Sequence, residues 1–352
     1  MKRRWTAFLL LMTITIFGLT GCSRKEELKR YDATFLELFD TVTTIVGFAG
    51  DKEEFSQFAQ DVHDDLEVYH QLYDIYNDYE GVNNIKTIND NAGIAPVKVD
   101  QKILDLLEFS KKADELTGGK INIAYGAVLR VWHEYREAGV DDPENAKLPP
   151  MEVLTEKAEH TDITKLIIDE TAKTVYLADP EMLLDVGAIA KGYATEMVVR
   201  DMMNKGYKNA MLSVGGNVRA IGSKPEGEAW NVGIQNPDTE SEDTNLYILK
   251  LKDCSLVTSG DYERYYTVDG KRYHHIIDPD TLMPSAYFTS VSIICQDSGL
   301  ADALSTSVFN MPYEQGLELV ESLEDTDALW VFKDGSMKYS SGFTNYLPEE
   351  DK

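Results

Sequence analysis

Strand-like and helix-like segments follow one another along this chain of 352 residues without a regular alternation. Runs of β-branched and apolar residues predict strands, whereas apolar residues three or four positions apart predict helices. A parallel sheet would require strands and helices in strict turn, so the irregular order favours a single α+β domain. We expect its mixed or antiparallel sheet layers to be covered by helices. The expected strands are 41–48, 166–168, 174–177, 209–214, 246–251, 288–294 and 328–332; the expected helices are 53–76, 101–117, 190–205, 301–310 and 313–322, with a loop at 78–93 and a polar insertion at 138–150.

The first 22 residues have the pattern of a bacterial lipoprotein signal. A basic start at residues 2–4 precedes an apolar run, residues 5–19, that is too short for a comfortable membrane span. Small residues then lead to Cys22, which we expect to become the lipidated N-terminus of an extracytoplasmic protein anchored to a bacterial membrane. The alternative is a signal peptide without lipid and an incidental cysteine. The expected organisation is the signal with its cysteine at 1–22, a tether at 23–33, one folded domain at 34–347 and an acidic tail at 348–352.

The charge of the chain excludes one class of partner. Its 61 acidic and 34 basic residues give a formal net charge of −27. Removal of residues 1–21 takes three basic residues from the total of −27 and leaves −30. A surface that binds nucleic acid is basic, and so is a surface that docks on anionic lipid. We therefore expect no nucleic-acid partner, and we expect lipid rather than charge to hold the protein at the membrane.

Two cysteines remain after Cys22, namely Cys254 and Cys295. Outside the cytoplasm they could form a disulfide. Both lie in apolar, strand-like runs, which favours buried free thiols. The sequence contains no C-x-x-C motif and no zinc-binding spacing.

Residues 258–279 gather the residue types of an active site: hydroxyls, the carboxylate of Asp261 and the adjacent pair His274 and His275. Adjacent residues on a strand point to opposite faces, so we expect only one of the two histidines to enter the site. A lone histidine is more often structural than catalytic, but Asp261 and Asp278 nearby strengthen the catalytic interpretation. The remaining histidines are expected to be surface or packing residues: His63, His70, His133 and His160.

Asp302 and Thr306 are four residues apart and therefore share one face of the predicted helix. A carboxylate and a hydroxyl on one face form half of a site for a hard cation. Mg²⁺ takes one or two protein ligands together with substrate phosphate oxygens, so this sparse pair suits a phosphate substrate. The alternative is that both residues cap the start of a helix.

Two glycine-containing segments suit close approach of the backbone to a ligand. Residues 184–194 lead from an apolar run through glycine to Lys191 at a helix start, where backbone N–H groups and a lysine favour phosphate. The alternative is a strand-to-helix turn with a surface lysine, because no P-loop motif is present. Residues 213–217 end a strand in Gly-Gly, which permits either a close approach or a simple turn.

Taken in order, these segments resemble the ApbE family, flavin transferases that use FAD to flavinylate proteins. The similarity covers about residues 34–345, so the folded domain is expected to be ApbE-like. The segments that carry it run in family order: 88–92, 117–119 with Trp132, 184–194, 213–217, 230–237, 258–279 and 301–306.

The resemblance implies an enzyme that splits FAD at its pyrophosphate. It would transfer FMN to a Thr or Ser hydroxyl of an extracytoplasmic flavoprotein of an electron-transfer system and release AMP. Mg²⁺ is the implied metal, with Mn²⁺ as the alternative. The resemblance implies His275 as the catalytic histidine, because it directly precedes Ile-Ile-Asp-Pro, with Asp261 assisting or orienting it. It implies FAD contacts by Tyr76, Lys120, Ile121, Asn122, Asp185, Lys191 and Ile276, and metal ligation by Asp302, Thr306 and the backbone carbonyl of Ala188.

Two other functions fit the same residues. One is an FAD pyrophosphatase of the same fold, which would produce FMN and AMP with water as the acceptor. The other is a flavin- or solute-binding lipoprotein without turnover. The binding protein would retain intact FAD and would tolerate His275→Ala, whereas either enzyme requires that residue.

Overall fold

The computed structural model describes residues 27–238 and 240–349. The predicted signal segment with Cys22, and residues 350–352 of the predicted acidic tail, lie outside the described residues. In the described part of the chain, no helix combines the length and the apolar character needed to cross a membrane.

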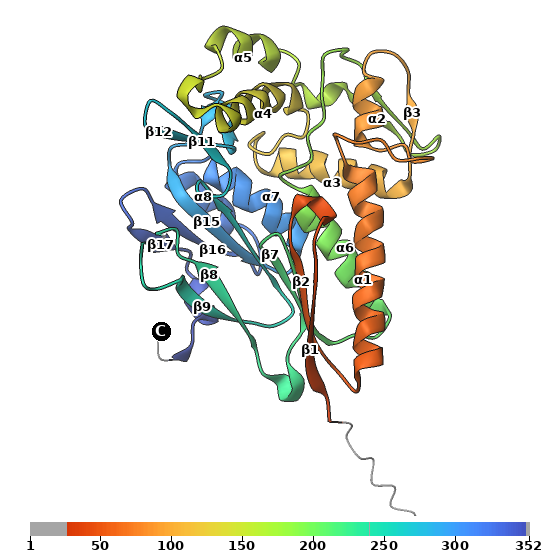
Figure 1. Ribbon diagram of the computed structural model, residues 1–352, viewed down its shortest axis with the longest axis vertical. Helices are drawn as coiled ribbons and strands as arrows, with labels where there is room; N and C mark the ends of the chain where they lie inside the picture. The colour runs from red at the N-terminus through yellow and green to blue at the C-terminus, as the bar shows by residue number, and fades with distance from the viewer. Residues whose placement is uncertain (1–26, 239, 350–352) are drawn as a thin grey trace, which may run out of the picture.

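An eight-stranded antiparallel sheet forms the centre of the molecule (Figure 1). Strand β6 alternates between buried and half-buried residues, with Ala210, Leu212 and Val214 buried. This arrangement confirms the predicted α+β class. In spatial order the strands are β1 (Lys29–Phe35), β2 (Thr43–Ala49), β6 (Asn209–Val214), β7 (Asn217–Gly222), β10 (Ser255–Gly260), β15 (Phe288–Cys295), β16 (Asp327–Phe332) and β17 (Met337–Tyr339).

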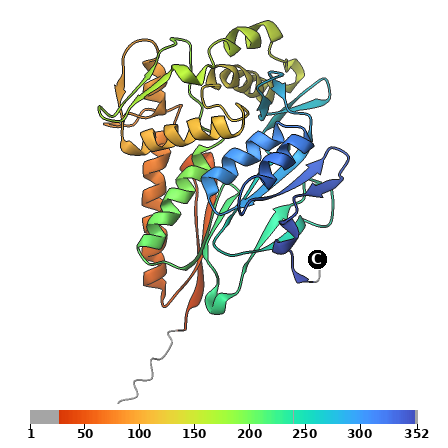
Figure 2. The ribbon, with the colours of Figure 1, turned by 180° about the vertical axis from the view of Figure 1, so that it is seen from behind.

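Helices cover one face of this sheet, and a hairpin covers part of the other. Figure 2 shows α6 (Ala190–Asn204), α7 (Ser298–Phe309) and α8 (Tyr313–Glu321) in front of the strands, and α1 (Lys52–Tyr73) beside α6. The apolar stripe of α1 is buried, because its spacing of three and four residues places those side chains on one face. On the opposite face, the hairpin of β8 (Trp230–Gln235) and β9 (Asn245–Leu251) buries an apolar cluster with the sheet.

A second layer lies at one end of the central sheet (Figure 1). Its helices are α2 (Ile85–Asp90), α3 (Gln101–Leu116), α4 (Gly126–Asp141) and α5 (Met151–Ala158). Its strands are β3 (Val97–Lys98), β5 (Thr174–Leu177) and β4 (Leu166–Asp169), with the pairs β11 (Tyr265–Val268) and β12 (Lys271–His274), and β13 (Ile277–Asp278) and β14 (Met283–Pro284). Short 3₁₀ turns complete the fold: η1 (Leu38–Asp40), η2 (Pro143–Asn145), η3 (Ile163–Lys165), η4 (Pro225–Gly227) and η5 (Phe343–Tyr346).

The hairpin of β11 and β12 lies against α4. Tyr266 donates a hydrogen bond from its hydroxyl to the Lys147 carbonyl at 3.0 Å, and Trp132 of α4 donates from Nε1 to the Leu282 carbonyl at 2.9 Å. Trp132 and Tyr266 share a small apolar cluster. The second layer is thereby tied to the segment that carries the two adjacent histidines.

Several local predictions are wrong. The expected loop at 78–93 contains α2, which Asn84 caps by accepting a hydrogen bond from the Thr87 N–H at 3.0 Å. The expected polar insertion at 138–150 begins inside α4. The expected tether at 23–33 overlaps β1, since Lys29 already pairs with Ala49. In two of these cases a polar composition concealed a regular element: α2 begins at a capping hydrogen bond, and β1 is held by its pairing with β2.

Cys254 and Cys295 are free, as the sequence favoured. Cys295 is buried at the end of β15, where its thiol donates to the Asp297 carbonyl at 3.0 Å. Cys254 is half-buried in the turn between β9 and β10, so the apolar run around it is two strands rather than one.

Candidate active site

A cavity of about 610 Å³ lies where the end of the central sheet meets the second layer. It is lined by the ends of β7 and β10, the turn before α6, one face of α7, the wall of α4 and the segment after β12. All but one of the predicted catalytic, FAD-binding and metal-binding residues line it: Tyr76, Lys120, Ile121, Asn122, Asp185, Ala188, Lys191, His275, Ile276, Asp302 and Thr306. The exception is Asp261. The fold therefore gathers into one cavity residues that are up to 230 positions apart, from Tyr76 to Thr306.

The first turn of α6 touches α7 at Gly192. A Cβ at this position would collide with Cβ of Asp302 and with the carbonyl oxygen of Ser298, so only glycine permits this approach. The contact lets the Gly192 N–H donate to Oδ2 of Asp302 at 2.8 Å. A helical N–H at residue 192 would otherwise bond the carbonyl four residues earlier. The Ala188 carbonyl consequently receives no hydrogen bond from the described residues, although Ala188 lines the cavity.

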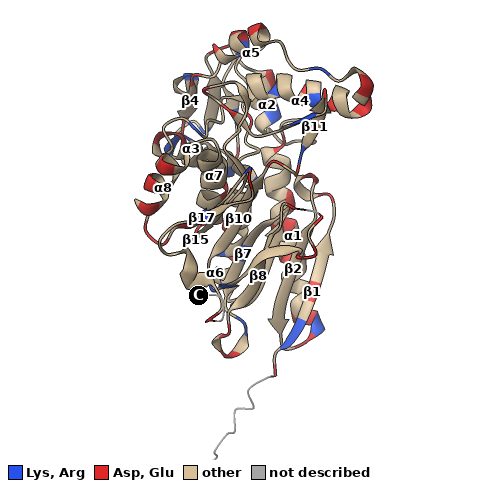
Figure 3. Ribbon diagram, turned by 90° about the vertical axis from the view of Figure 1, so that its left-hand side faces the viewer, with Lys and Arg blue, Asp and Glu red and all other residues tan. Residues whose placement is uncertain are grey.

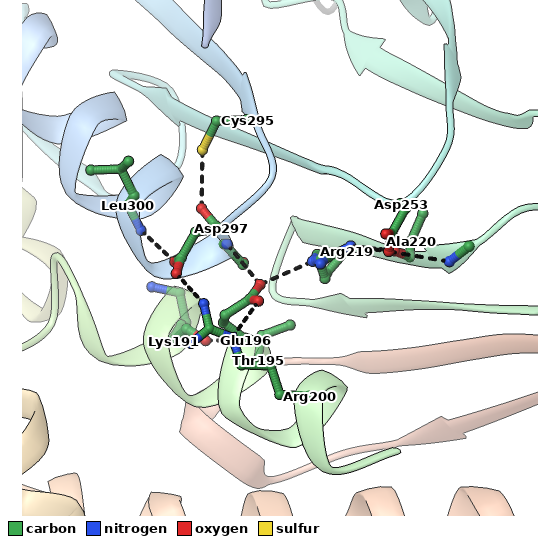
Figure 4. A network of polar contacts seen from close by, with 12 residues as sticks. Lys191, Thr195, Glu196, Arg200, Arg219, Ala220, Asp253, Cys295, Asp297 and Leu300 are labelled. Atoms are coloured by element: carbon green, nitrogen blue, oxygen red, sulfur yellow. Dashed lines mark hydrogen bonds and ion pairs between the residues drawn. The ribbon is translucent and has the colours of Figure 1, made fainter. Parts of the chain in front are cut away.

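A buried ionic network holds α6 and α7 in this position (Figure 4). Glu196 of α6 accepts from Nε of Arg219 at 2.9 Å and from the N–H of Ser298, the first residue of α7, at 3.0 Å. Arg200 donates to Glu196 at 2.9 Å and to Asp297 at 2.7 Å, and Asp297 caps α7. Since Glu196 and Arg219 are almost fully buried, this network fixes the start of α7 against α6.

Oxygen donors suited to a hard cation meet at this junction. Asp302 is 5% exposed, and no described residue forms an ion pair with it. Burial raises the pKa of the Asp302 carboxyl, while Lys191 and the Gly192 N–H oppose that rise. The Thr306 hydroxyl lies one helical turn further along α7. A buried carboxylate without a cation, a hydroxyl and a free carbonyl are the ligands that Mg²⁺ or Mn²⁺ prefers, so the residues fit the predicted metal.

Lys191 and Asp185 flank the same junction. Asp185 accepts from the Gly187 N–H at 2.8 Å, which shapes the turn that leads into α6. Burial raises the pKa of the Asp185 carboxyl. The Lys191 ammonium lies 3.5 Å from the Gly187 carbonyl and makes no ion pair within the described part of the chain. Lys191 therefore brings to the cavity a positive charge that no carboxylate of the described residues contacts directly, although it acts at longer range on Asp185 and Asp302.

His275 follows β12 and lines the cavity, whereas His274 points the other way. His274 is buried, with Nε2 2.9 Å from the Ser285 carbonyl and its ring edge-on to Phe309. The expectation that only one of the pair enters the site is confirmed.

The His275 ring is neutral, and its tautomer follows from one contact. Burial, and next the charge of Arg264, lower the pKa of His275 to about 3. Nδ1 lies 3.3 Å from the Arg264 carbonyl, which can only accept a hydrogen bond. Nδ1 must therefore carry the proton, and Nε2 keeps its lone pair.

Asp261 is not placed beside His275. Its carboxylate forms an ion pair with Lys333, which follows β16, and its N–H donates to the Thr289 carbonyl at 3.0 Å. The prediction that Asp261 assists or orients His275 is not supported, because β10 pairs with β15, and β15 pairs with β16, which brings Asp261 to Lys333. Thr258 and Ser259 belong to β10.

Two of the predicted FAD contacts also make structural bonds. Lys120 pairs with Asp278 at 3.0 Å and with Asp280 at 2.7 Å, so neighbouring carboxylates already neutralise its charge. Asn122 donates to the Thr161 carbonyl at 2.9 Å and accepts from the Ala124 N–H at 2.8 Å. Both residues thus hold the segment before α4 against the rest of the cavity wall.

The α4 wall contains cavity residues that the sequence did not indicate. His133, expected to be a packing or surface residue, lines the cavity and lies against the Tyr76 ring at 5.5 Å. Arg136 donates to Nδ1 of His133 at 2.7 Å. Arg136 and Arg264 line the cavity without an ion-pair partner among the described residues. Once α4 is recognised, the spacing of 133 and 136 on one helical face is the signal that would have found them.

The unpaired cations stand out against the rest of the molecule. Acidic residues are spread over the outer helices and loops, α5 and α8 among them (Figure 3). The whole chain carries −27, yet Lys191, Arg136 and Arg264 face one cavity without ion-pair carboxylates in the described structure. These three cations are available to an anionic ligand, although the carboxylates of Asp40, Asp74, Asp185, Glu263 and Asp302 line the same cavity.

Comparisons with known proteins agree with this geometry. The model of the ApbE family matches residues 39–330. An FAD:protein FMN transferase of Treponema pallidum is 36% identical over 272 residues, which cover 74% of this chain and 74% of that protein. One of Klebsiella pneumoniae is 33% identical over 276 residues, covering 77% of this chain and 83% of that protein. The crystal structure of the ApbE protein of Thermotoga maritima superposes with a TM-score of 0.80 at 29% identity, over 91% of this chain and all of the other.

Proposed function

The chain belongs to the ApbE family, and from this premise we propose that it splits FAD at the pyrophosphate and transfers FMN to a Thr or Ser hydroxyl of an acceptor protein. It is an enzyme of the FAD:protein FMN transferase type. The acceptor is an extracytoplasmic flavoprotein of an electron-transfer system. One observation carries the proposal: a single cavity contains an oxygen-rich corner for a hard cation, unpaired positive charges and a neutral histidine.

The corner between α6 and α7 would hold Mg²⁺ or Mn²⁺ through Asp302, Thr306 and the Ala188 carbonyl. When bound, the ion would supply neutralisation of the pyrophosphate oxygens. Lys191 adds a point charge beside the same phosphates. The preorganised carboxylate of Asp302, held by the Gly192 N–H at 2.8 Å, needs no rearrangement for this role.

His275 would act as the general base. Its Nε2 accepts the proton of the acceptor hydroxyl while the hydroxyl oxygen forms a bond to the FMN phosphorus. The bond from that phosphorus to the AMP oxygen breaks, and AMP leaves. Burial lowers the pKa of His275 most, and the charges of Arg264, Arg136 and Lys191 lower it further, to about 3. The negative charge of FAD would offset these cations, so substrate binding would raise the proton affinity of the base.

We further propose that Cys22 carries the lipid anchor. The first strand begins at Lys29, which leaves residues 23–28 between lipid and sheet, a reach of at most about 20 Å. Asp40 and Thr41, just beyond the opposite end of β1, line the cavity. The length of that strand, roughly 20 Å, would hold the cavity away from the membrane-proximal end.

The test incubates the mature chain from residue 23 with FAD and Mg²⁺, with and without a secreted flavoprotein that has an exposed Thr. AMP release and in-gel flavin fluorescence are followed. The expected result is AMP together with flavin fixed to the acceptor, lost when the acceptor Thr is replaced by Ala. Asp302→Ala and His275→Ala should each lower the rate by at least about 10².

Two results would contradict the transferase. Free FMN and AMP formed without an acceptor would identify a pyrophosphatase. Stable retention of intact FAD with every acceptor, unaffected by His275→Ala, would identify a binding protein.

A further inference from the structure

The hydroxyl groups of Thr306, Ser259 and Ser305 form a row that ends at a backbone carbonyl of α7. The Ser305 hydroxyl donates to the Asp302 carbonyl at 2.9 Å. The Ser259 hydroxyl, at the end of β10, lies 2.9 Å from the Ser305 oxygen. The same Ser259 oxygen lies 3.4 Å from Oγ1 of Thr306. The row therefore runs from a backbone carbonyl to one of the residues predicted to hold the cation.

The direction of each hydrogen bond follows from counting protons. A hydroxyl has one hydrogen to donate and two lone pairs to accept with. Ser305 uses its hydrogen on the Asp302 carbonyl, so Ser259 donates to Ser305. Ser259 has then used its own hydrogen, so Thr306 donates to Ser259, in the longest and weakest contact of the row. The Thr306 lone pairs are left free, which is the condition for binding a cation.

Ser305 also blocks a competing orientation of Thr306. A helical threonine commonly turns its hydroxyl hydrogen to the carbonyl four residues earlier. For Thr306 that carbonyl belongs to Asp302, and Ser305 already occupies it. One carbonyl has two lone pairs, and the helix ladder uses the other.

We propose that Ser259 and Ser305 are positioning residues for the cation site. They hold the Thr306 hydroxyl with its hydrogen turned to β10 and its lone pairs available to the ion. This role rests on the proposed function, because it presumes that Thr306 is a metal ligand. The role would account for the meeting of two serines beside Thr306, one near the end of β10 and one inside α7.

The chain offers a matched control in Ser307. Like Ser305, it is a fully buried serine of α7, and its hydroxyl donates to the carbonyl three residues earlier, Leu304, at 3.1 Å. No hydroxyl of the described residues donates to Ser307. Ser305→Ala and Ser307→Ala therefore remove the same local bond, and only Ser305→Ala breaks the row to Thr306.

The experiment titrates the FAD-free mature protein with Mn²⁺ and measures the free ion by electron paramagnetic resonance. Ser259→Ala and Ser305→Ala should weaken Mn²⁺ binding by about tenfold, the effect typical of a residue that orients a metal ligand. Ser307→Ala should bind as the unaltered protein does, and Ser259→Thr, which keeps the hydroxyl, should restore the affinity. The thermal midpoint of each variant is measured in parallel.

The outcomes separate this proposal from the proposed function. Equal weakening by Ser305→Ala and Ser307→Ala would overturn the positioning role, because the effect would then come from the stability of α7. Unchanged binding in Ser259→Ala, with weaker binding in Thr306→Val, would overturn the hydroxyl row and leave the cation site intact. Failure of the unaltered protein to bind Mn²⁺, or no effect of Asp302→Asn and Thr306→Val, would overturn the cation site itself.

Discussion

The cavity has two walls: one contains a buried ion pair, and the other contains arginines that face the cavity. Where α6 meets α7, Glu196 and Arg219 are both buried and joined at 2.9 Å, and Gly192 brings the helices into contact. On the α4 side, Arg136 and Arg264 line the cavity with no carboxylate partner in the described structure. Burial raises the pKa of Asp302 on the first wall and lowers the pKa of Arg136 on the second.

This difference separates two tasks of an active site. A buried ion pair holds the backbone around it in place, because loss of either partner leaves the other charge buried without compensation. An unpaired guanidinium at a cavity wall contributes little rigidity but remains available to an anionic ligand. We therefore expect the α6–α7 wall to govern stability and cation geometry, and the α4 wall to govern affinity for FAD.

The largest expected effect is on the first wall. Glu196→Ala should lower the free energy of unfolding by about 3–5 kcal/mol, because Arg219 is then buried without its main carboxylate partner. Urea unfolding followed by circular dichroism measures it. Arg200→Ala is the control: its side chain is 54% exposed, and its loss should cost less than about 1 kcal/mol. Equal costs for the two variants would remove the distinction between buried and exposed parts of the network.

Contact between α6 and α7 can be disturbed without changing any charge. Gly192→Ala should cost about 1–3 kcal/mol of stability, because its Cβ meets Asp302 and the Ser298 carbonyl. The same variant should weaken Mn²⁺ binding, since Asp302 must shift. Gly316→Ala on α8 is the control: the nearest atom to its Cβ is 3.3 Å away, on a Val308 side chain. A Gly192→Ala protein with normal stability and normal Mn²⁺ binding would show that the close approach is dispensable.

On the α4 wall the expected effect is on binding. Arg136→Ala or Arg264→Ala should raise KM for FAD by about tenfold, because a charged hydrogen bond to an anion is lost. Unfolding should be almost unchanged, since neither arginine has a carboxylate partner within the described residues. Arg130→Ala, on the same helix but exposed and paired with Glu134, should leave KM as it is. A fall in stability without a change in KM would contradict the division of tasks between the walls.

The last expected effect concerns pH and His275. The folded protein holds the pKa of His275 at about 3, below its ordinary value of 6.5. Between these two pH values the unfolded chain binds a proton that the folded chain does not, so this residue's contribution to stability falls as the pH is lowered. His275→Gln should make the decline in unfolding midpoint between pH 7 and pH 4 shallower. Parallel curves for the two proteins would show that His275 is not held in its neutral form.

Local pattern was sufficient for much of the fold. Helix α1 and strand β6 were predicted because the residues that decide them are neighbours in the chain. Helix α2 and strand β1 were missed for the opposite reason. The first depends on a capping bond of Asn84, and the second on pairing with β2, while their own compositions are polar.

For the site, the sequence by itself determined which residues share a helical face and that only one histidine of an adjacent pair enters the cavity. Asp302 and Thr306 are one turn apart in α7, and His275 enters the cavity while His274 is buried away from it, because these relations depend on helix and strand periods. Tertiary structure alone decided what those residues meet. It paired Asp261 with Lys333, brought His133 and Arg136 to the cavity and freed the Ala188 carbonyl through the contact at Gly192. These outcomes depend on how distant segments pack, and spacing along the chain carries no information about which faces will come together.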